Sequence, residues 1–434
     1  MTVKLLLDRK REGRELAPDE IRELVREYTA GSVPDYQMAA FAMAVCCRGM
    51  TGAETLALTE AMRDSGTCLE WPAGEYPPSA DKHSTGGVGD KISLVAQPLA
   101  AACGLAVPSL TGRGLGLTGG TADKMESIPG YVAALPLSDY RRVVRDCGCT
   151  LTVQTAEIAP ADKKLYGLRD VTGTVPSIPL IVASILSKKL AEGAGTLVFD
   201  VKCGSGAFMK TREEAAALAR ALVDGAKGAG RKACALVTVM DEPLGFAVGN
   251  ANEVQEAIDV LKCESRAFDV ETLSVELAAR MVSLAKGAPL EEARAECRRK
   301  LVSGDAYRRF ARMVELHGGS LEEFAKSRLA PVEAADVTAG ESGYVQSIDA
   351  RGVAEAAFLL GAGRARSDEA VDFLAGVDLG VASGDRVEVG VQLARLATAT
   401  RGGALEEAAR LVRDAIVIGP DMPASRDLVL EVVA

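Results

Sequence analysis

The stretch from Gly195 to Met240 reads GTLVFDVK-CGSGAFMKT-REEAAALARALVDGAKGAG-R-KACALVTVM. Its two apolar runs, 195–202 and 232–240, are short and rich in Val and Leu, which predicts buried β-strands. The segment 212–230 between them is dominated by Ala, Leu, Glu and Arg, which favour a helix. A strand, a helix and a second strand in this order are typical of a parallel sheet with a helix packed on it.

The same alternation extends toward the N-terminus. The runs LAVPSL (105–110) and CTLTVQ (149–154) predict two further strands, and DYRRVVRDCG (139–148) predicts a helix before the second. Residues 1–65 have helical periodicity throughout, and WPAGEYPPSA (71–80) has three prolines and predicts a linker.

Two later segments complete the expected organisation. Residues 160–191 return to a helical pattern and are expected to pack on the N-terminal helices, while strand-like runs after Gly343 surround a helix. We therefore predict an α/β fold with a mainly parallel central sheet and a cleft between its first two domains. The domains are a small all-helical one (1–65 with 160–191), a larger α/β one (75–158 with 192–335) and a C-terminal α+β unit (343–434).

Charge and composition exclude several classes of function. The net charge is −10 and the isoelectric point is near 5.1, which argues against a general binder of nucleic acid or of anionic membranes. No apolar run is long enough for a membrane span, and the N-terminus lacks the pattern of a signal peptide. The ten cysteines are scattered in apolar segments, which favours reduced thiols and a cytoplasmic protein.

Two glycine-rich loops concentrate the unusual residues. They are KHSTGGVGD (82–90), which holds one of only two histidines, and TGRGLGLTGGTADK (111–124). Such loops let backbone N–H groups approach an anion, and a predicted helix follows each. The alternative to an anion site is that both loops are tight turns whose hydroxyl groups have no binding role. GLGLTG (114–119) fits a dinucleotide motif only weakly, and GGVGDK lacks the spacing of a nucleotide-binding P-loop.

A third cluster lies in the helical segment 160–191. Ser184 and Lys188 are four residues apart and share a helix face, and Arg169 ends the preceding helix. A solvated basic face accounts well for the neighbouring Lys189. It accounts less well for the other three residues, whose flanks are apolar and whose donors suit the carbonyl edge of a heterocycle.

These motifs resemble one enzyme family. KHSTGGVGDK, GRGLG-TGGT-DK-ESIPG, LYGLRDVTGTV-SIPL---SI-SKKLAEG and the later GAGRARSDEAVDFLAGVDLGV occur in the order seen in pyrimidine-nucleoside and thymidine phosphorylases, family II of the nucleoside phosphorylases. The resemblance covers nearly the whole chain. It implies reversible phosphorolysis of uridine, thymidine or deoxyuridine to free base and pentose 1-phosphate, in a cytoplasmic homodimer with phosphate as co-substrate and no organic cofactor.

The resemblance also implies roles for individual residues. His83, between the two substrates, would be catalytic together with Arg169 and Lys188, by donating a proton or hydrogen bond and by stabilising negative charge on the leaving base. The ordinary histidine pKa of about 6.5 suits this near neutral pH. Phosphate would contact Lys82, Ser84, Ser93, Thr111 and Thr121. The pyrimidine would contact Leu115, Tyr166, Arg169, Val175, Ser184, Lys188 and Phe208.

Some positions depart from the family pattern. Relatives carry lysine where this chain has Ser109, histidine where it has Leu117, and an acidic residue where it has Pro176. Weaker phosphate binding or a changed sugar or acceptor preference would follow. Some members bind a monovalent cation, K⁺ or Na⁺. The matching positions here are Gly89, Lys91, Leu244, Ala247 and Glu256, with Lys91 in place of a small hydroxyl residue.

The sequence leaves alternatives open. They are a thymidine-restricted phosphorylase, a related phosphoribosyltransferase or nucleotide phosphorylase on the same fold, and a degenerate member that binds pyrimidines without catalysis. Ser109 and Leu117 are the residues that keep the last alternative open.

Overall fold

The central sheet joins segments from distant parts of the chain, in a computed structural model that describes residues 2–114, 117, 119–366 and 369–434. β4 pairs in parallel with β5 on one side and with β1 on the other. β2 and β3 form a second parallel pair, which a bridge between Ser79 and Ala106 joins to the start of β1. The predicted α/β class is therefore confirmed. The strands are β1 (Ala80–Ser84), β2 (Val107–Thr111), β3 (Cys149–Val153), β4 (Thr196–Cys203), β5 (Lys232–Val239) and the antiparallel β13 (Val429–Val433).

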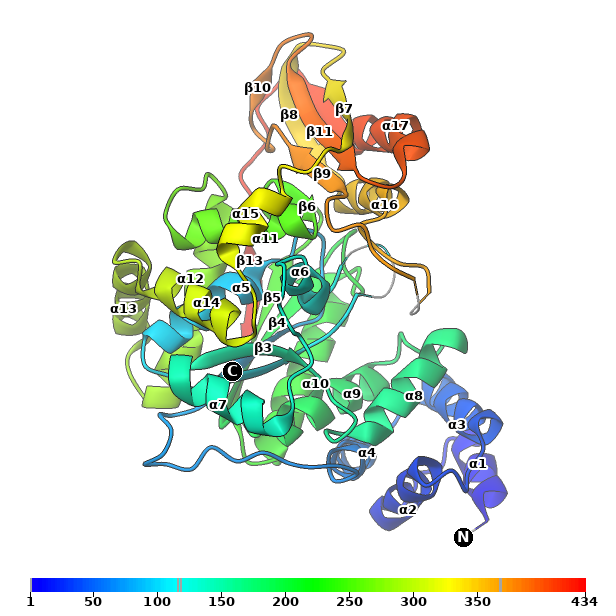
Figure 1. Cartoon of the computed structure of the whole chain (residues 1–434). Coiled ribbons are helices and arrows are strands. Elements are labelled where there is room, and N and C mark those ends of the chain that lie inside the picture. The colour runs from blue at the N-terminus through cyan, green and yellow to red at the C-terminus, as the bar shows by residue number, and fades with distance from the viewer. Residues whose placement is uncertain (1, 115–116, 118, 367–368) are drawn as a thin grey trace.

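Every residue of β4 is buried because helices cover both faces of the sheet (Figure 1). Leu197, Phe199 and Val201 belong to one hydrophobic core, whereas Val198 belongs to another, as the two-residue period of a strand requires. α10 packs on the first face, and α5 and α12 pack on the second. The helices of this unit are α5 (Ile92–Ala102), α6 (Thr121–Glu126), α7 (Leu137–Cys147), α10 (Arg212–Gly228), α11 (Ala251–Leu261), α12 (Phe268–Lys286), α13 (Leu290–Val302), α14 (Asp305–Leu316) and α15 (Leu321–Ser327).

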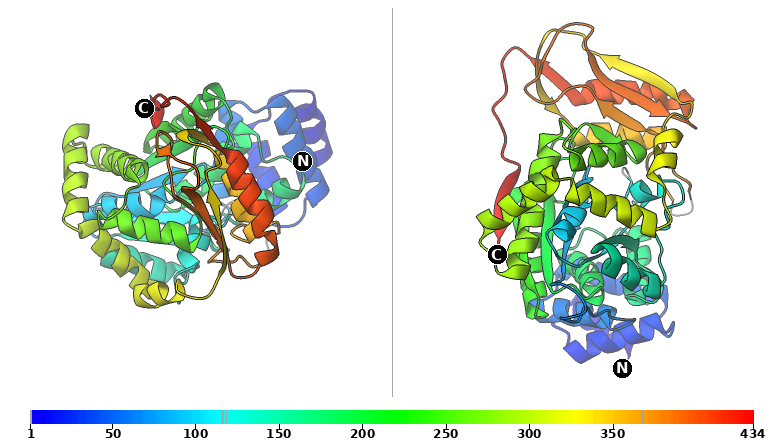
Figure 2. Two further views of the ribbon diagram at one scale, coloured as in Figure 1. Left: turned by 90° about the horizontal axis from the view of Figure 1, so that it is seen from above. Right: turned by 60° about the vertical axis from the view of Figure 1, so that its left-hand side comes forward.

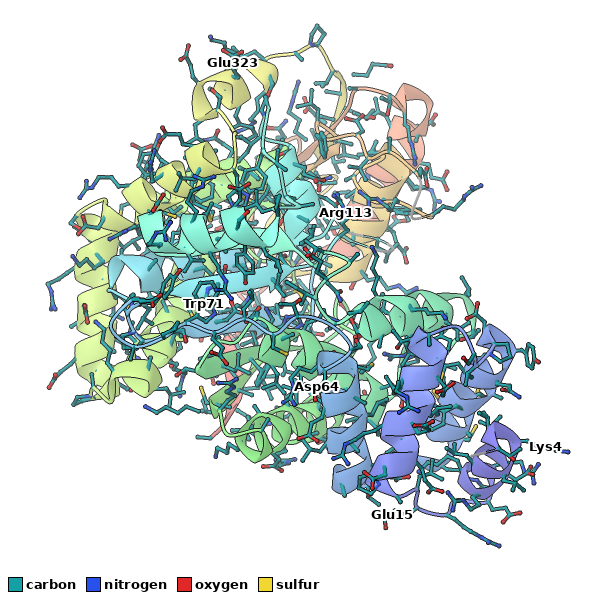
Figure 3. All side chains as sticks on the ribbon, turned by 60° about the horizontal axis from the view of Figure 1, so that its bottom comes forward. Lys4, Glu15, Asp64, Trp71, Arg113 and Glu323 are labelled. Carbon is teal, nitrogen blue, oxygen red and sulfur yellow. The ribbon has the colours of Figure 1, made fainter. Side chains whose placement is uncertain are left out.

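A separate helical unit is built from the two segments that the sequence predicted to pack together. Residues of both segments, such as Leu58 and Leu180, share one hydrophobic core. Figure 3 shows Lys4 and Glu15 on this unit and Trp71 on the α/β unit. The helices are α1 (Val3–Arg11), α2 (Pro18–Thr29), α3 (Asp35–Arg48), α4 (Gly52–Arg63), α8 (Pro160–Val171) and α9 (Ile178–Ala191).

The chain crosses between these two units in three segments that are hydrogen-bonded together. The backbone N–H of Thr67 donates to Glu157 O (2.6 Å), and that of Leu69 donates to Ala191 O (2.7 Å). The indole of Trp71 donates to Glu192 O (2.7 Å), which fixes the start of the predicted linker. The junction is therefore an ordered part of the fold.

The C-terminal unit differs from the predicted boundaries at both ends. The range predicted for the α/β domain ended at 335, within β7, but this strand joins a sheet with β11, β9 and β6, and a second sheet contains β10, β8 and β12. The last segment leaves the unit, and β13 pairs with β5 (Figure 2). The elements are β6 (Ala247–Gly249), β7 (Glu333–Thr338), β8 (Gly343–Ile348), α16 (Ala350–Leu360), β9 (Gly376–Leu379), β10 (Arg386–Val387), β11 (Gln392–Thr398), a 3₁₀ turn (Gly402–Ala404), α17 (Leu405–Ala415) and β12 (Ile416–Gly419).

None of the helices in the described ranges is long and apolar enough to cross a membrane.

Candidate active site

The first glycine-rich loop begins at the carboxyl end of β1. The sequence predicted a loop over 82–90, but Lys82, His83 and Ser84 lie on the strand itself, with Ser84 opposite Asp200 of β4. The glycines follow, and α5 begins at Ile92. In open parallel sheets ligands bind outside the carboxyl ends of the strands, so this is the edge where a substrate is expected.

Three of the five predicted phosphate residues gather at this edge. The Lys82 ammonium lies 3.3 Å from Ser93 Oγ and 3.4 Å from the Asp200 carboxylate. Ser84 Oγ donates to Asp90 Oδ2 (2.5 Å) and accepts from the Gly86 N–H. A cation, two hydroxyl groups and a turn of backbone amides therefore meet around Asp90, which the sequence analysis did not single out.

Asp90 stands among three ammonium groups. Burial alone would raise its pKa, but the charges of Lys82, Lys202 and Lys124 outweigh burial and hold the pKa well below the ordinary value. Lys202 and Lys124 have carboxylate partners of their own, Asp200 (2.9 Å) and Glu253 (2.6 Å). Because the cations are nearly balanced by carboxylates, the hydroxyl and amide donors are expected to contribute much of the binding of an anion.

The second glycine-rich loop is organised by Asp123, a buried residue of α6. Its Oδ2 accepts from the N–H groups of Gly114 (2.6 Å) and Gly120 (2.9 Å). Its Oδ1 accepts from Arg364 of the C-terminal unit (2.5 Å). Of the other predicted phosphate residues, Thr111 ends β2 and Thr121 begins α6.

The two loops meet through the next residue of α6, since the ammonium of Lys124 donates to Asp90 O (3.0 Å).

His83 is partly exposed near the carboxyl end of β1. No hydrogen bond links either ring nitrogen to another residue within the described part of the chain, so both remain available to a substrate. Burial, followed by the charges of Lys189, Lys188 and Lys82, lowers the pKa of His83 well below 6.5. The ring is therefore neutral at neutral pH. A neutral ring can donate a hydrogen bond but cannot act as an imidazolium acid, so only the first of the two roles predicted for His83 fits this charge state.

This charge state has a consequence for the pH dependence of activity. A histidine whose folded-state pKa is depressed becomes charged only as the pH falls well below 6.5. We therefore expect kcat/KM for the nucleoside to stay level between pH 6.5 and 8, and to decline only at lower pH. A profile that falls with rising pH through about 6.5, measured at constant ionic strength, would show that the charged ring is the active form.

The base-side residues lie on α8 and α9. The Lys188 ammonium donates to Asp162 Oδ2 (2.5 Å) and to Ser184 Oγ (3.0 Å). α9 lies against β1, since the ammonium of Lys189 contacts the Asp81 carboxylate (2.5 Å), and the charge of Lys188 on the same helix lowers the pKa of His83. Asp162 escaped the sequence analysis, since an acidic residue in the first turn of a helix is commonplace.

Arg169 is buried, with its guanidinium turned toward the backbone. It donates to the carbonyls of Thr174 (3.2 Å), Leu180 (2.9 Å) and Val175 (2.7 Å). Arg169 therefore fixes the connection between α8 and α9.

The remaining predicted residues have varied surroundings. Tyr166 and Val175 are half-buried, Phe208 is exposed, and Leu115 lies outside the described residues. Ser109, at the position where relatives have lysine, is buried and accepts from Gln97 (2.8 Å). Leu117 packs against the main core, and Pro176 is exposed.

The environment of Lys189 differs from the one predicted. The sequence analysis assigned it to a solvated face, but the side chain is buried, and its ammonium contacts Asp81 (2.5 Å), Glu192 (3.0 Å) and Leu110 O (2.8 Å). The buried carboxylate of Asp81 explains the error, because it lies on another segment, which a helix pattern does not reveal.

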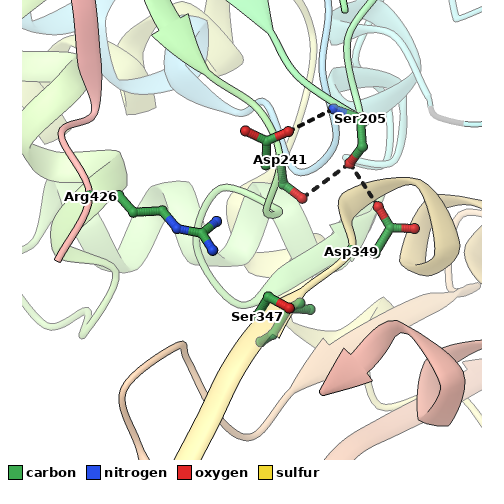
Figure 4. Close-up of a pocket in the computed structure, with 6 residues that line it drawn as sticks. Ser205, Asp241, Ser347, Asp349 and Arg426 are labelled. Carbon is green, nitrogen blue, oxygen red and sulfur yellow. Dashed lines mark hydrogen bonds between the residues drawn. The ribbon is translucent and has the colours of Figure 1, made fainter. Parts of the chain in front are cut away.

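A pocket of about 430 Å³ lies away from these residues, between the α/β and C-terminal units (Figure 4). Ser205 donates there to Asp349 (2.7 Å), and its backbone N–H donates to Asp241 (3.0 Å). Ser205 precedes Phe208 in the loop after β4, so this contact ties the loop to the C-terminal unit.

Three descriptions of known protein families match separate parts of the chain. The description "Glycosyl transferase family, a/b domain" matches residues 76–307, "Glycosyl transferase family, helical bundle domain" matches residues 4–66, and "Pyrimidine nucleoside phosphorylase C-terminal domain" matches residues 344–419.

Two relatives illustrate the similarity in sequence. The chain is 46% identical over 431 residues to a thymidine phosphorylase of Mesorhizobium japonicum, with 98% of this chain and 97% of the relative covered. It is 45% identical over 433 residues to a thymidine phosphorylase of Agrobacterium fabrum, with 98% of each covered.

A solved structure supports the fold alone. Anthranilate phosphoribosyltransferase from Thermus thermophilus superposes with a TM-score of 0.58 at 21% identity, covering 72% of this chain and 98% of the other.

Proposed function

Because this chain belongs to the glycosyl transferase family of its thymidine phosphorylase relatives, we propose that it catalyses the reversible phosphorolysis of pyrimidine nucleosides. The substrates are thymidine, deoxyuridine and uridine, with inorganic phosphate as co-substrate, and the products are free base and pentose 1-phosphate. The observation that carries the proposal is the position of neutral His83, between a glycine-rich anion edge and the Lys188 charge on α9.

The chemistry follows from this arrangement. The C–N glycosidic bond breaks with its electron pair moving to the base, while a phosphate oxygen forms the new bond to the anomeric carbon. Negative charge builds on the base carbonyls, where Lys188 and the N–H of His83 donate hydrogen bonds. The Lys82 ammonium and the hydroxyls of Ser84 and Ser93 hold the phosphate in line, and the base nitrogen finally takes a proton from solvent.

Arg169 acts differently from the direct contact implied by the family. Its hydrogen bonds to three backbone carbonyls support a positioning role, in which Arg169 orders the α8–α9 connection. Ser184 is oriented by Lys188, and Tyr166, Val175 and Phe208 complete the proposed pyrimidine site. Thr111 and Thr121 complete the phosphate site.

The cellular setting is part of the same proposal. All ten cysteines are free thiols, which supports a cytoplasmic location.

The adjacent helices α1 and α3 carry three exposed apolar side chains, Leu5 (63% exposed), Tyr36 (74%) and Met43 (44%). This apolar surface supports a homodimer.

The direct test is base release with and without phosphate. Purified protein is incubated with thymidine, deoxyuridine or uridine, free base is followed by ultraviolet absorbance, and pentose 1-phosphate is identified by chromatography. We expect base release only with phosphate, and the thymidine-to-uridine ratio decides between a broad and a thymidine-restricted enzyme. Release from no pyrimidine nucleoside would refute the proposal. Consumption of phosphoribosyl diphosphate with Mg²⁺ would identify a phosphoribosyltransferase instead.

A further inference from the structure

The ammonium of Lys91 lies at the centre of the predicted cation site. Lys91 is fully buried, and its Nζ donates to Leu244 O (2.8 Å), to Ala247 O (2.9 Å) and to the carboxylate of Glu256. These oxygens are the ones that the sequence assigned to K⁺ or Na⁺. The Gly89 turn packs against the same Leu244 carbonyl, since a Cβ added at Gly89 would lie 2.5 Å from Leu244 O.

The ammonium is fully satisfied in this position. A lysine has three N–H donors, and three acceptors surround Nζ. Burial by itself lowers the pKa of Lys91, but the carboxylates of Glu256 and Glu253 outweigh it and raise the pKa above the ordinary value. The group therefore stays charged and supplies one positive charge to Glu256.

A metal ion does not fit beside this group. Carbonyl and carboxylate oxygens are suitable ligands for a monovalent cation, but Nζ fills the space between them. A second cation within contact distance would be repelled by the ammonium.

We propose that the Lys91 side chain serves as a built-in cation, which makes this protein independent of monovalent metal ions, and that removing the side chain turns the same oxygens into a K⁺ or NH₄⁺ site.

Lys91 is placed to position the first glycine-rich loop. Its contacts join the Gly89 turn to the loop before β6 (Leu244 O), to the first residue of β6 (Ala247 O) and to α11 (Glu256). The adjacent Asp90 holds Ser84, a proposed phosphate residue. Glu256 in turn accepts hydrogen bonds from the N–H groups of Phe246 (2.8 Å) and Ala247 (3.1 Å). The backbone therefore holds in place the Glu256 carboxylate, which together with Leu244 O and Ala247 O forms the oxygen cage around Nζ. Lys91 is thus a positioning residue, whose effect should be seen in KM for phosphate more than in kcat.

An ion from solvent can reach the cage once the side chain is shortened. A pocket of about 270 Å³ is lined by Phe246, Ala247 and Glu256. Its acidic side chains outnumber its arginines, which leaves the lining with net negative charge; these residues are Glu256, Asp259, Glu264 and Asp378 against Arg266 and Arg328. The Glu256 side chain is 11% exposed to it.

The first experiment uses the unmodified protein. Thermal stability and phosphorolysis are measured in KCl, NaCl and tetramethylammonium chloride at one ionic strength. We expect the Tm and the rate to be the same in all three salts. A several-fold loss of rate or a lower Tm in tetramethylammonium, restored by K⁺, would overturn the proposal.

The second experiment compares Lys91→Ser with Lys91→Met. The serine variant opens the cage, so K⁺ or NH₄⁺ should raise its Tm by about 2–4 °C in a concentration-dependent manner and lower its KM for phosphate. The methionine variant loses the charge but fills the space, so neither ion should affect it. Equal responses of the two variants, or none from a folded serine variant, would contradict a latent site.

The activity readout rests on the proposed function, whereas the Tm readout does not. If neither variant folds, the salt comparison on the unmodified protein still decides whether Lys91 replaces the ion.

Discussion

Replacing His83 with alanine should lower kcat for phosphate-dependent base release by about 10²–10³-fold, the loss typical of removing one donor aimed at developing negative charge. The His83 ring lies at the end of β1 under the influence of the Lys188 charge, and no side chain within the described ranges competes for its nitrogens. Binding of the free pyrimidine should change little, because α8 and α9 hold the base-side residues. Steady-state kinetics and calorimetric titration with thymine separate the two effects.

The other histidine provides the matched control. His317 is buried at the end of α14, with one ring nitrogen bonded to Thr150 (2.9 Å) and the other to Val132 O (2.8 Å). Its ring stacks on Tyr131, with centroids 4.4 Å apart. His317→Ala should therefore lower the Tm and leave kcat of the folded protein unchanged. Equal kcat values for His83→Ala and the unmodified protein would remove His83 from the mechanism.

Replacing Lys189 with methionine should destabilise the protein by about 3–5 kcal/mol, because removal of one partner leaves buried charge uncompensated. Lys189, Asp81 and Glu192 are each almost completely buried, and the ammonium joins both carboxylates. Burial, and then the charge of Asp81, already raise the pKa of Glu192 well above 4.5. Without the ammonium, the two carboxylates face each other in a site closed to water.

The pH dependence of that loss has a definite sign. Without Lys189 the pKa of Glu192 rises further in the folded state, so the variant loses stability as the pH rises above the ordinary glutamate pKa toward that of the folded protein. The loss of unfolding free energy in Lys189→Met should be largest at pH 8 and should shrink toward pH 5. Thermal unfolding at each pH measures it. Lys326→Met is the control, since Lys326 makes only exposed contacts with Glu322 and Glu323. A Lys189 variant no less stable than this control would show that the buried network contributes little.

Apolar patterning accounts for what could be predicted from the sequence. β4, β5 and α10 are visible in the stretch from Gly195 to Met240, because burial on both faces of a sheet requires continuous apolar residues. The grouping of His83 with Lys188 came from motif resemblance and the spacing of donors on α9.

Features that depend on paired charges were not predictable. β1 has the sequence Ala-Asp-Lys-His-Ser, which lacks a strand pattern because Asp81 and Lys82 find their partners, Lys189 and Asp200, on other segments. The Arg364–Asp123 contact joins residues 241 positions apart. Only the folded chain reveals which charges are neutralised.

The pairing of β13 with β5 bears on how the molecule is made. Val433 lies opposite Ala235, so the strand that covers this edge of the sheet is synthesised after β5 and after the whole C-terminal unit. Until β13 has been made, β5 is paired with β4 on one side only, and exposed strand edges invite association with other chains. Nascent chains that lack β13 should therefore recruit chaperones at β5, and chains truncated before Val429 should aggregate.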